Sequence, residues 1–571
     1  MLALFLGVCC SSHSEASTSF YVDPDWTGIQ NGSASQPWNS LSANSWASIN
    51  AALAADDVTI YLDALKANGT TQQTYPHFLQ VRRVNTSSHR LTIDGYSQYN
   101  TNETSPSWTS NPDTDINHAY LDGKVCKVTG DGGSQGIGWT RSDGNDFVTH
   151  NGLVYCCIES HVASSDNEPG VGANWRLYWD QHGSSSTIWS SGTTYKCYPK
   201  QENVTLRGFE ITGVGARAQF GGDNLIWEYN YLHDVTNIGP GMQLNYTSLP
   251  DSSAAQIISR PSTNMTFHHF KVKNTFGEGF YLGSINPDAP GSFQLAHGNQ
   301  HSHILIEDFV IQNPGANGGQ GDAIDCKNGV TYLTIRLGDI SGFGANGNGI
   351  NLPMTAINTD QHNLVERNFI HDSTHDALGA QRAIHAQTGD TTGSTLYGIV
   401  GLTIRNNVVA NASLGIQVSG NTSPSQPVDQ AFVFNNTVYN CSPEGDLAVN
   451  TNITNSVVKN NFAFAGSSPC AAIGSTGIVS DYNAHDGSWN SPSEGTHTLA
   501  LSSTHALASV VDAVTENFHL VFGAPIIDMA QTQASFSNDF DGDPRGLLWD
   551  IGAYEFASTA TPTPTPTSET K

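Results

Sequence analysis

Residues 401–411 (GLTIRNNVVAN) and residues 430–440 (QAFVFNNTVYN) follow one pattern, in which a short run alternates apolar and polar residues and then reaches an asparagine. The pattern recurs between about residues 203 and 464, for example at residues 203–213 (NVTLRGFEITG). Recurrence at a period of roughly 20–50 residues is typical of solenoids, propellers and arrays. Several of these segments are followed by a second short strand pattern, such as GDAIDCKN at residues 321–328, with no helical stretch between. The repeat therefore predicts an all-β fold, a right-handed parallel β-helix.

Composition narrows the function classes. The chain has 571 residues, all of which one solenoid can use, and a formal net charge of -28. A strongly acidic chain is repelled by nucleic acid and by an anionic membrane surface. Charged residues make up only 13% of the chain and there are 56 glycines, which suits short strands joined by many turns. We therefore expect a monomeric protein without a nucleic-acid partner.

The two ends differ from the repeats. Residues 1–17 (MLALFLGVCCSSHSEAS) look like the apolar core and small-residue exit of a secretory signal peptide, although no basic residue precedes the apolar run. This run is too short to span a bilayer, so we expect a secreted protein without a membrane span. Residues 557–571 form a Pro/Thr-rich linker that cannot build a core and could tether the protein to a cell surface.

Four of the nine cysteines, Cys126, Cys156, Cys157 and Cys197, cluster in one segment. In a secreted chain such clustering predicts local disulfides, whose pairing the sequence leaves open. Their spacing lacks the paired CxxC pattern of a zinc site.

The segments that flank the repeats resemble those of known proteins. Residues 20–41 (FYVDPDWTGIQNGSASQPWNSL) resemble the entry of secreted β-helix enzymes that degrade polysaccharides, and residues 539–556 (DFDGDPRGLLWDIGAYEF) resemble their closing motif. The resemblance implies a pectin-lyase-like fold with a capping helix, expected at residues 45–56, and says little about chemistry. On this basis residues 18–125 form the cap and first coils, and residues 199–556 form the β-helix with its groove.

Residues 126–198 interrupt the repeats with a segment rich in aromatic residues and cysteine. The segment resembles the small chitin- and cellulose-binding modules of chitinases, and the residues that match in order are Val148, Asn151, Gly152, Tyr155, Cys157, His161, Pro169 and Trp175. Flat aromatic rings stack on the apolar faces of sugars. The resemblance therefore implies an insoluble glycan as a partner, with candidate stacking residues Trp175, Tyr178, Trp179 and Trp189. Two alternatives remain: these rings form the core of a small domain, or the insert shapes a wall of the groove.

Aligning the second strands of successive repeats predicts two columns of side chains. Strands alternate faces, so the column that must point into the apolar core contains Phe280, Ile324, Ile350, Ile384 and Ile416. The next residue of each strand points outward, which gives an exposed polar column of Tyr281, Asp325, Asn351, His385 and Gln417. Neighbours in such a column lie about 4.8 Å apart, so together they can bind one extended substrate.

Lys327 lies close in sequence to Asp322 and Asp325 in a chain that has few basic residues, and Glu278 occupies the preceding coil. A lysine amine tuned by such neighbours can remove the C5 proton of a uronic acid, which starts a β-elimination. The charge that develops on the uronate needs a cation, which carboxylate-bound Ca²⁺ can supply. A surface ion pair is the structural alternative for this lysine.

Residues 321–335 (GDAIDCKNGVTYLTI) resemble the catalytic coil of the chondroitinase-B and alginate lyase family. The resemblance implies that Asp322, with Glu278, binds Ca²⁺ and that Lys327, five positions later, is the base. The family usually has an arginine on the following coil, where this chain has Pro353; Arg382 or His385 would take its place. Lys327, Arg382, His385 and Asp325 are thus the predicted catalytic residues, and the remaining members of the polar column bind substrate.

The sequence thus predicts a secreted lyase that acts on a uronic-acid-containing polysaccharide. A glycoside hydrolase is an alternative, because Glu278, Asp322, Asp325 and Asp376 offer pairs of carboxyl groups that could flank a sugar about 5–9.5 Å apart. A non-catalytic glycan-binding β-helix protein of the cell surface is the second alternative.

Overall fold

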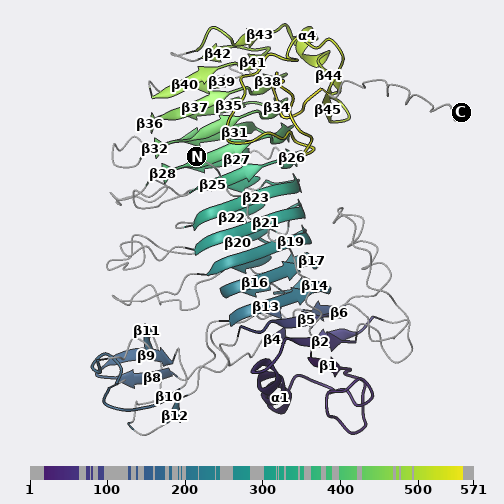
Figure 1. The fold of residues 1–571 in the computed structure, drawn as a ribbon, viewed down its shortest axis with the longest axis vertical. Helices are drawn as coiled ribbons and strands as arrows, with labels where there is room; N and C mark the ends of the chain where they lie inside the picture. The colour runs from purple at the N-terminus through teal and green to yellow at the C-terminus, as the bar shows by residue number, and fades with distance from the viewer. Residues whose placement is uncertain are drawn as a thin grey trace, which may run out of the picture.

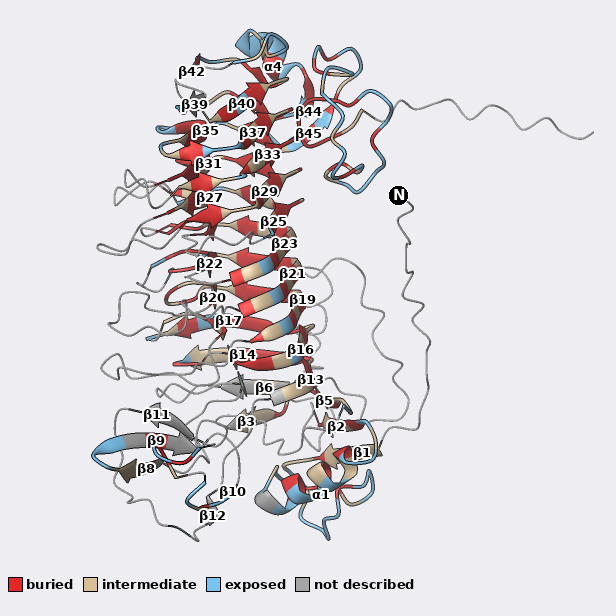
Figure 2. Ribbon diagram, turned by 60° about the vertical axis from the view of Figure 1, so that its left-hand side comes forward, coloured by how far each residue is buried: buried red, intermediate tan, exposed pale blue. Residues whose placement is uncertain are grey.

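The protein is a stack of coils along one long axis, seen here in a computed structural model (Figure 1). Figure 2 shows that buried residues dominate the strands of the stack, while exposed residues gather in the segments at its ends. The structure describes residues 18–63, 72–76, 79–80, 88–95, 126–129, 137–138, 147–157, 161–166, 168–173, 179–182, 191, 194–195, 201–216, 218–237, 239–244, 262–282, 301–316, 318, 320–326, 330–344, 347–352, 362–374, 381–388, 398–420, 427–466, 471–474, 477–490 and 494–556.

One parallel sheet contains twelve strands, one from each of twelve successive coils. These strands are β4 (Leu79–Gln80), β7 (Ile137–Gly138), β15 (Ala218–Phe220), β18 (Met242–Leu244), β20 (Phe280–Leu282), β22 (Ile324–Cys326), β24 (Ile350–Asn351), β27 (Arg382–Gln387), β31 (Leu414–Ser419), β35 (Gly445–Asn450), β39 (Ala471–Ile473) and β42 (Trp489–Asn490). A smaller parallel sheet contains β28 (Ile399–Val400), β32 (Val428–Asp429) and β36 (Ile453–Thr454).

A second large sheet contains 23 strands in two rows that meet at a corner. The first row contains β1 (Thr18–Val22), β2 (Val58–Leu62), β5 (Leu91–Asp94), β13 (Gln201–Arg207), β16 (Gly222–Glu228), β19 (Thr263–Lys273), β21 (His301–Gln312), β23 (Val330–Ser341), β25 (Asn363–Glu366), β29 (Leu402–Arg405), β33 (Phe432–Phe434), β37 (Ser456–Lys459) and β40 (Ile478–Asp481). The second row contains β3 (Thr74–Pro76), β6 (Cys126–Thr129), β14 (Phe209–Val214), β17 (Tyr231–Thr236), β26 (Phe369–His371), β30 (Val408–Ala410), β34 (Thr437–Tyr439), β38 (Phe462–Phe464), β41 (Ala484–His485) and β43 (Leu499–Ala500). The long strands β19, β21 and β23 continue through the corner into the second row. The predicted parallel β-helix is confirmed.

The corner between the two rows is made by a residue in the left-handed backbone conformation in each coil. These corner residues are Tyr229, His269, Asp308, Leu337, Arg367, Asn406, Asn435, Asn460 and Tyr482. Asparagine tolerates this conformation better than most residues, because its short polar side chain bonds locally. Asparagine makes three of these corners, at Asn406, Asn435 and Asn460.

The residue after each corner forms a second column, which points inward and is asparagine in six of these coils. These residues are Asn230, Asn368, Asn407, Asn436, Asn461 and Asn483, all buried. Asn407, for example, donates from Nδ2 to the carbonyl of Val365 and to Oδ1 of Asn436, each at 3.0 Å. The ladder pairs backbone and side-chain polar groups inside the core, where an unpaired group is costly.

In coils between those of Asn230 and Asn368, aromatic rings fill this column in place of asparagine. The rings of Phe270 and Phe309 stack with their centroids 5.5 Å apart. Gly338 follows on the next coil, where a Cβ atom would lie only 2.2 Å from the ring of Phe309. A glycine is therefore required next to the last ring of the stack.

At the N-terminal end, α1 (Ala43–Leu53) confirms the helix expected at residues 45–56. Ser42 begins it by accepting a hydrogen bond from the amide of Ser45, as N-cap serines do. Trp46, Ile49 and Leu53 recur at helical spacing and are buried in the same apolar cluster as the coils. This helix is thus packed on the solenoid core.

The structure alters the N-terminal boundary of the insert expected at residues 126–198. β6 pairs in parallel with β14, and β7 pairs with β15, so both belong to the solenoid. The two strands are too short to display the periodicity of a coil in the sequence. The separate antiparallel strands are β8 (Phe147–His150), β9 (Leu153–Cys157), β11 (Trp179–His182), β10 (His161–Val162) and β12 (Thr194–Tyr195).

The C-terminal segment docks along the side of the stack. It contains α4 (Ser503–Leu507) and the hairpin of β44 (Val510–Asp512) and β45 (Asn517–Leu520), followed by the predicted closing motif. In that motif Arg545 is buried, donates to Oδ1 of the corner residue Asn406 at 3.0 Å, and pairs with Glu555 at 2.9 Å. The amide of Gly552 donates to the carbonyl of Asn460 at 2.8 Å. The closing motif therefore forms hydrogen bonds with the corner residues of several coils.

Several expectations fall outside the described residues, namely the segments 1–17 and 557–571 and the side chains of Cys126, Cys156, Cys157 and Cys197. Cys326 and Cys441 are described, and both are buried. Within the described part of the chain, no helix has the length and apolar character that a membrane span requires.

Replacement of Asn407 by alanine should destabilise the protein by about 1–3 kcal/mol, because it leaves buried polar partners on two coils unpaired. Urea unfolding followed by circular dichroism measures this loss. The control is Asn490→Ala, which changes an exposed asparagine on β42 and should cost less than about 0.5 kcal/mol. Equal losses in the two variants would contradict a special role for the buried ladder.

Candidate functional site

The predicted polar column lies on the twelve-stranded sheet. The pairing of adjacent strands places Tyr281 beside Asp325, Asp325 beside Asn351, Asn351 beside His385, and His385 beside Gln417. The neighbouring apolar column of Phe280, Ile324, Ile350, Ile384 and Ile416 is fully buried in the core. Both predicted columns therefore exist in the predicted register.

Hydrogen bonds join three members of the polar column into a chain. Asn351 donates from Nδ2 to Oδ1 of Asp325 at 3.0 Å. Its Oδ1 therefore faces His385, whose Nδ1 lies 2.9 Å away. Nε2 of His385 lies 2.9 Å from the side-chain amide of Gln387, two residues further along β27. The chain fixes the imidazole at both nitrogens.

The charge state of His385 follows from its surroundings. Burial, together with the charge of Arg382, lowers the pKa of His385 to about 4, so the imidazole is neutral at neutral pH. A neutral imidazole carries one proton, and both of its nitrogens face an amide oxygen, Oδ1 of Asn351 and Oε1 of Gln387. The ring can therefore donate to only one of these two oxygens at a time.

The column is less exposed than expected. We expected all five side chains to be exposed, but Asp325 is fully buried and Asn351 is only 7% exposed. Tyr281, His385 and Gln417 are half-buried. The difference arises because a short side chain in the middle of the column lies between neighbours on both adjacent coils. A ligand can therefore reach the ends of the column more readily than Asp325.

Arg382 opens β27 and is half-buried. Burial lowers its pKa, and the charge of Glu444 opposes that shift. Its own charge contributes to the low pKa of His385, so the two side chains lie within electrostatic reach of each other. A cation thus stands beside the neutral imidazole.

The residues expected to bind calcium were Glu278 and Asp322. Their turns are stacked, since Gly279 donates its backbone amide to the carbonyl of Asp322. Asp322 is fully buried, and its carboxylate accepts hydrogen bonds from the backbone amide of Asn348, from Nδ2 of Asn348 at 3.0 Å, and from Gln320. Three N–H donors directed at one carboxylate do not fit a calcium ligand, which needs free oxygen lone pairs. The surroundings of Asp322 therefore do not fit the predicted calcium site.

Several predicted residues fall where the structure gives no side-chain account. Lys327, Trp175, Tyr178, Trp189 and Asp376 lie outside the described residues. Trp179 begins β11, and only its backbone is described. The roles assigned to them remain predictions.

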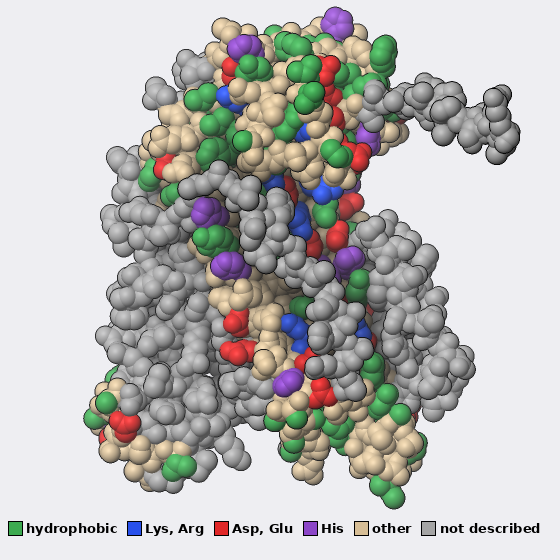
Figure 3. All heavy atoms as spheres, in the orientation of Figure 1, with side chains coloured by type: hydrophobic (Ala, Val, Ile, Leu, Met, Phe, Trp, Pro, Cys, Tyr) green, Lys and Arg blue, Asp and Glu red, His purple; other side chains and the backbone are tan. Residues whose placement is uncertain are grey.

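Figure 3 shows acidic, basic and histidine side chains gathered in a band along the stack.

The sequence reasoning missed a second polar cluster, on the second row of the large sheet. Glu210 is fully buried and accepts hydrogen bonds from Lys127 at 2.9 Å, Gln72 at 2.7 Å and His233 at 3.1 Å. Burial alone would raise the pKa of Glu210, but the hydrogen bonds from His233, Lys127 and Gln72 outweigh it and hold the pKa below its usual value. Its members come from segments that share no motif, so aligning the repeats does not reveal this cluster.

No family model matches the chain, and no curated protein matches it. Solved structures with a likeness to this fold include the pectate lyase Pel9A (13% identity, 95% of this chain and 97% of that chain, TM-score 0.35). Others are an alginate lyase from Paenibacillus sp. str. FPU-7 (10% identity, 76% and 96%, TM-score 0.36) and the GH136 lacto-N-biosidase from Eubacterium ramulus (12% identity, 85% and 67%, TM-score 0.37). Likenesses at this level of identity do not indicate which reaction this chain catalyses.

The low pKa of His385 predicts a pH dependence of stability. Between its ordinary pKa of 6.5 and about 4, the unfolded chain binds a proton that the folded protein excludes, so stability falls as the pH is lowered through this window. Removing the imidazole should abolish a loss of about 3 kcal/mol between pH 6.5 and pH 4. Urea unfolding of His385→Gln across this range tests the expectation, with the exposed His303→Gln as control. Parallel pH curves for wild type and His385→Gln would contradict it.

Proposed function

We propose that this protein is a secreted polysaccharide-degrading enzyme, and that it cleaves a uronic-acid-containing polymer by β-elimination on the twelve-stranded sheet. The observation that carries the proposal is the polar column, in which the chain from Asp325 through Asn351 holds a neutral His385 beside the cation Arg382. Tyr281, His385 and Gln417, in register on parallel strands and half-buried, could contact the hydroxyl and carboxylate groups of an extended glycan.

The reaction would proceed through groups of this chain alone. Lys327 would take the C5 proton of a uronate, the electron pair would form the C4–C5 double bond, and the C4–O bond would break, with the departing oxygen taking a proton from water. Arg382 would neutralise the sugar carboxylate as negative charge develops on it. His385 would hydrogen-bond to a sugar hydroxyl, which can both donate and accept, and, being neutral, would not compete with Arg382 for the carboxylate.

Burial of the aspartates favours this reaction over glycoside hydrolysis. A hydrolase needs two carboxyl groups that reach opposite faces of the glycosidic bond. Asp322 and Asp325 are both fully buried, and each accepts a hydrogen bond from an amide of a neighbouring coil. Of the candidate carboxylates that the structure describes, only Glu278 is half-buried rather than fully buried. The candidates on the neighbouring coil offer it no accessible second carboxylate. A lyase needs one base and one cation instead.

Lyase activity is tested by the ultraviolet absorbance of unsaturated uronate products. The wild-type protein should give a rising absorbance with one of alginate, pectate, chondroitin, dermatan or glucuronan. Lys327→Ala should lower the rate by about 10²–10⁴-fold, the usual contribution of a general base. His385→Gln should mainly raise KM, because it removes a contact with the sugar. Asn490→Ala is the matched control, since Asn490 is an exposed residue further along the same sheet.

The same assay with a calcium chelator tests whether the reaction depends on a metal ion. Because the carboxylate of Asp322 is already occupied by amide donors, a calcium chelator should leave the rate within about twofold. Full activity in Lys327→Ala would refute the assigned base. A flat absorbance on every polymer, with new reducing ends, would establish hydrolysis, and neither signal together with glycan affinity would establish a binding protein.

We further propose that the insert with the antiparallel strands, between residues 147 and 195, binds an insoluble glycan through Trp175, Tyr178, Trp179 and Trp189. The full-length protein should sediment with chitin or cellulose, and Trp179→Ala should weaken the affinity about 5–30-fold, as loss of a sugar-stacking ring costs roughly 1–2 kcal/mol. Asn490→Ala again serves as the control. No sedimentation with any insoluble glycan would count against the insert as a binding module.

A further inference from the structure

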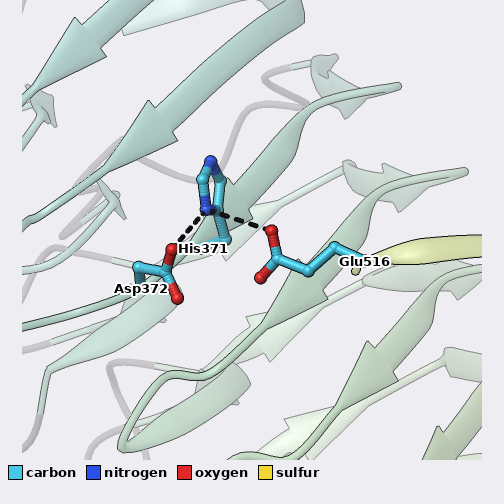
Figure 4. A group of neighbouring side chains, drawn as sticks. All are labelled: His371, Asp372 and Glu516. Carbon is cyan, nitrogen blue, oxygen red and sulfur yellow. Dashed lines mark hydrogen bonds and ion pairs between the residues drawn. The ribbon is translucent and has the colours of Figure 1, made fainter. Parts of the chain in front are cut away.

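Three side chains from two distant parts of the chain converge where the C-terminal hairpin meets the solenoid (Figure 4). His371 ends β26, Asp372 follows it, and Glu516 lies in the turn between β44 and β45. Nδ1 of His371 lies 3.0 Å from Oδ2 of Asp372 and 3.5 Å from Oε2 of Glu516. Each of the three residues offers one ligand atom, and these atoms all lie within 4.8 Å of one another.

The outer atoms of the three side chains are held by other residues. Nε2 of His371 lies 3.2 Å from Oδ1 of Asp339, which fixes the ring and leaves the Nδ1 lone pair directed inward. Nδ2 of Asn411 donates to Oδ1 of Asp372 at 3.1 Å and to Oε1 of Glu516 at 2.9 Å. One amide thus orients both carboxylates so that their second oxygens face the imidazole. A carboxylate behind the histidine and an amide behind the acids are the supports that metal ligands require.

The charges at this point call for a cation. Asp339, Asp372 and Glu516 surround a single imidazole, and within the part of the chain that the structure describes none of the three pairs with a lysine or an arginine. With the Nε2 proton directed at Asp339, the Nδ1 lone pair of a neutral His371 would face two carboxylate oxygens. Either a proton or a metal ion must occupy that position to make the contact favourable.

The distances match tetrahedral zinc. Zinc binds imidazole nitrogen and carboxylate oxygen at about 2.0–2.2 Å, so two ligand atoms of a tetrahedral site lie about 3.3–3.5 Å apart. The distances of 3.0 and 3.5 Å from Nδ1 to the two oxygens lie around this value. A nitrogen among three ligands disfavours Ca²⁺ and Mg²⁺, which prefer oxygen. Asp372 is exposed, so water can reach the fourth position.

We propose that His371, Asp372 and Glu516 bind one Zn²⁺ ion, which fastens the C-terminal hairpin to the coil that contains β26. The ion joins residues that are far apart in the sequence, so it stabilises the docked hairpin against the undocked one. The site is separate from the polar column and does not depend on the proposed lyase activity. Its role is structural.

The test uses the full-length protein, stripped with a chelator and then equilibrated with Zn²⁺ alone. Because 21 histidines offer adventitious sites, the readout is the difference in bound zinc between wild type and variants. Glu516→Gln keeps an oxygen for Asn411 while it replaces the inner oxygen by a donor, and His371→Gln removes the nitrogen ligand. Each should bind one Zn²⁺ fewer than wild type. Asp339→Asn should weaken this zinc about 10–100-fold, the usual effect of changing a group behind a ligand.

The matched control is His519→Gln. His519 lies on the same hairpin and pairs with Asp541 at 2.8 Å, without a place in the three-residue cluster. This variant should bind as much zinc as wild type. Zinc should also raise the unfolding temperature of wild type and His519→Gln but not of Glu516→Gln, whereas all three should unfold at similar temperatures in chelator. Equal zinc content in wild type, His371→Gln and Glu516→Gln, or no tight zinc in the wild type, would overturn the proposal.

Discussion

The structure depends on one constraint, which is that each coil must turn from the first row of the large sheet to the second without leaving a buried polar group unpaired. A residue in the left-handed conformation makes the turn, and the next side chain fills the corner from inside. Where that side chain is an asparagine, as at Asn407 and Asn436, its amide bonds to the backbone and to the next coil. Where it is Phe270 or Phe309, ring stacking fills the corner and polar pairing is left to the strands. Both solutions keep successive coils in register.

Register in turn determines the candidate site. The corner fixes where each coil begins its next strand, so equivalent residues of successive coils stack on the twelve-stranded sheet. A slip of one residue on β22 would move Asp325 into the core and Ile324 to the surface. The hydrogen bonds from Asp325 through Asn351 to His385 therefore exist because the corners on the opposite side of the coil hold their positions. The chemistry of one sheet rests on the packing of the other.

The sequence predicted the repeats, the sheet register and the polar column, because strand alternation and corner asparagines recur in it at regular intervals. It did not predict the burial of Asp325, since burial depends on the height of neighbouring side chains rather than on alternation. It also missed the cluster around Glu210, whose partners Gln72, Lys127 and His233 come from segments with no common motif. The contact of Glu516 with His371 is beyond any local pattern, because it depends on how far the C-terminal hairpin extends along the stack.

The outer faces of the two sheets have different tasks. On the second row of the large sheet, Val408, Phe462 and Phe464 are apolar and pack against Phe518 and Ile526 of the C-terminal segment. On the twelve-stranded sheet the corresponding outward positions are polar from Tyr281 to Gln417. An outward face that carries apolar side chains needs a cover, and the C-terminal segment supplies it. A polar outward face needs no such cover, so its side chains can contact a ligand. This difference, more than any single residue, is why the proposed substrate is placed on the twelve-stranded sheet.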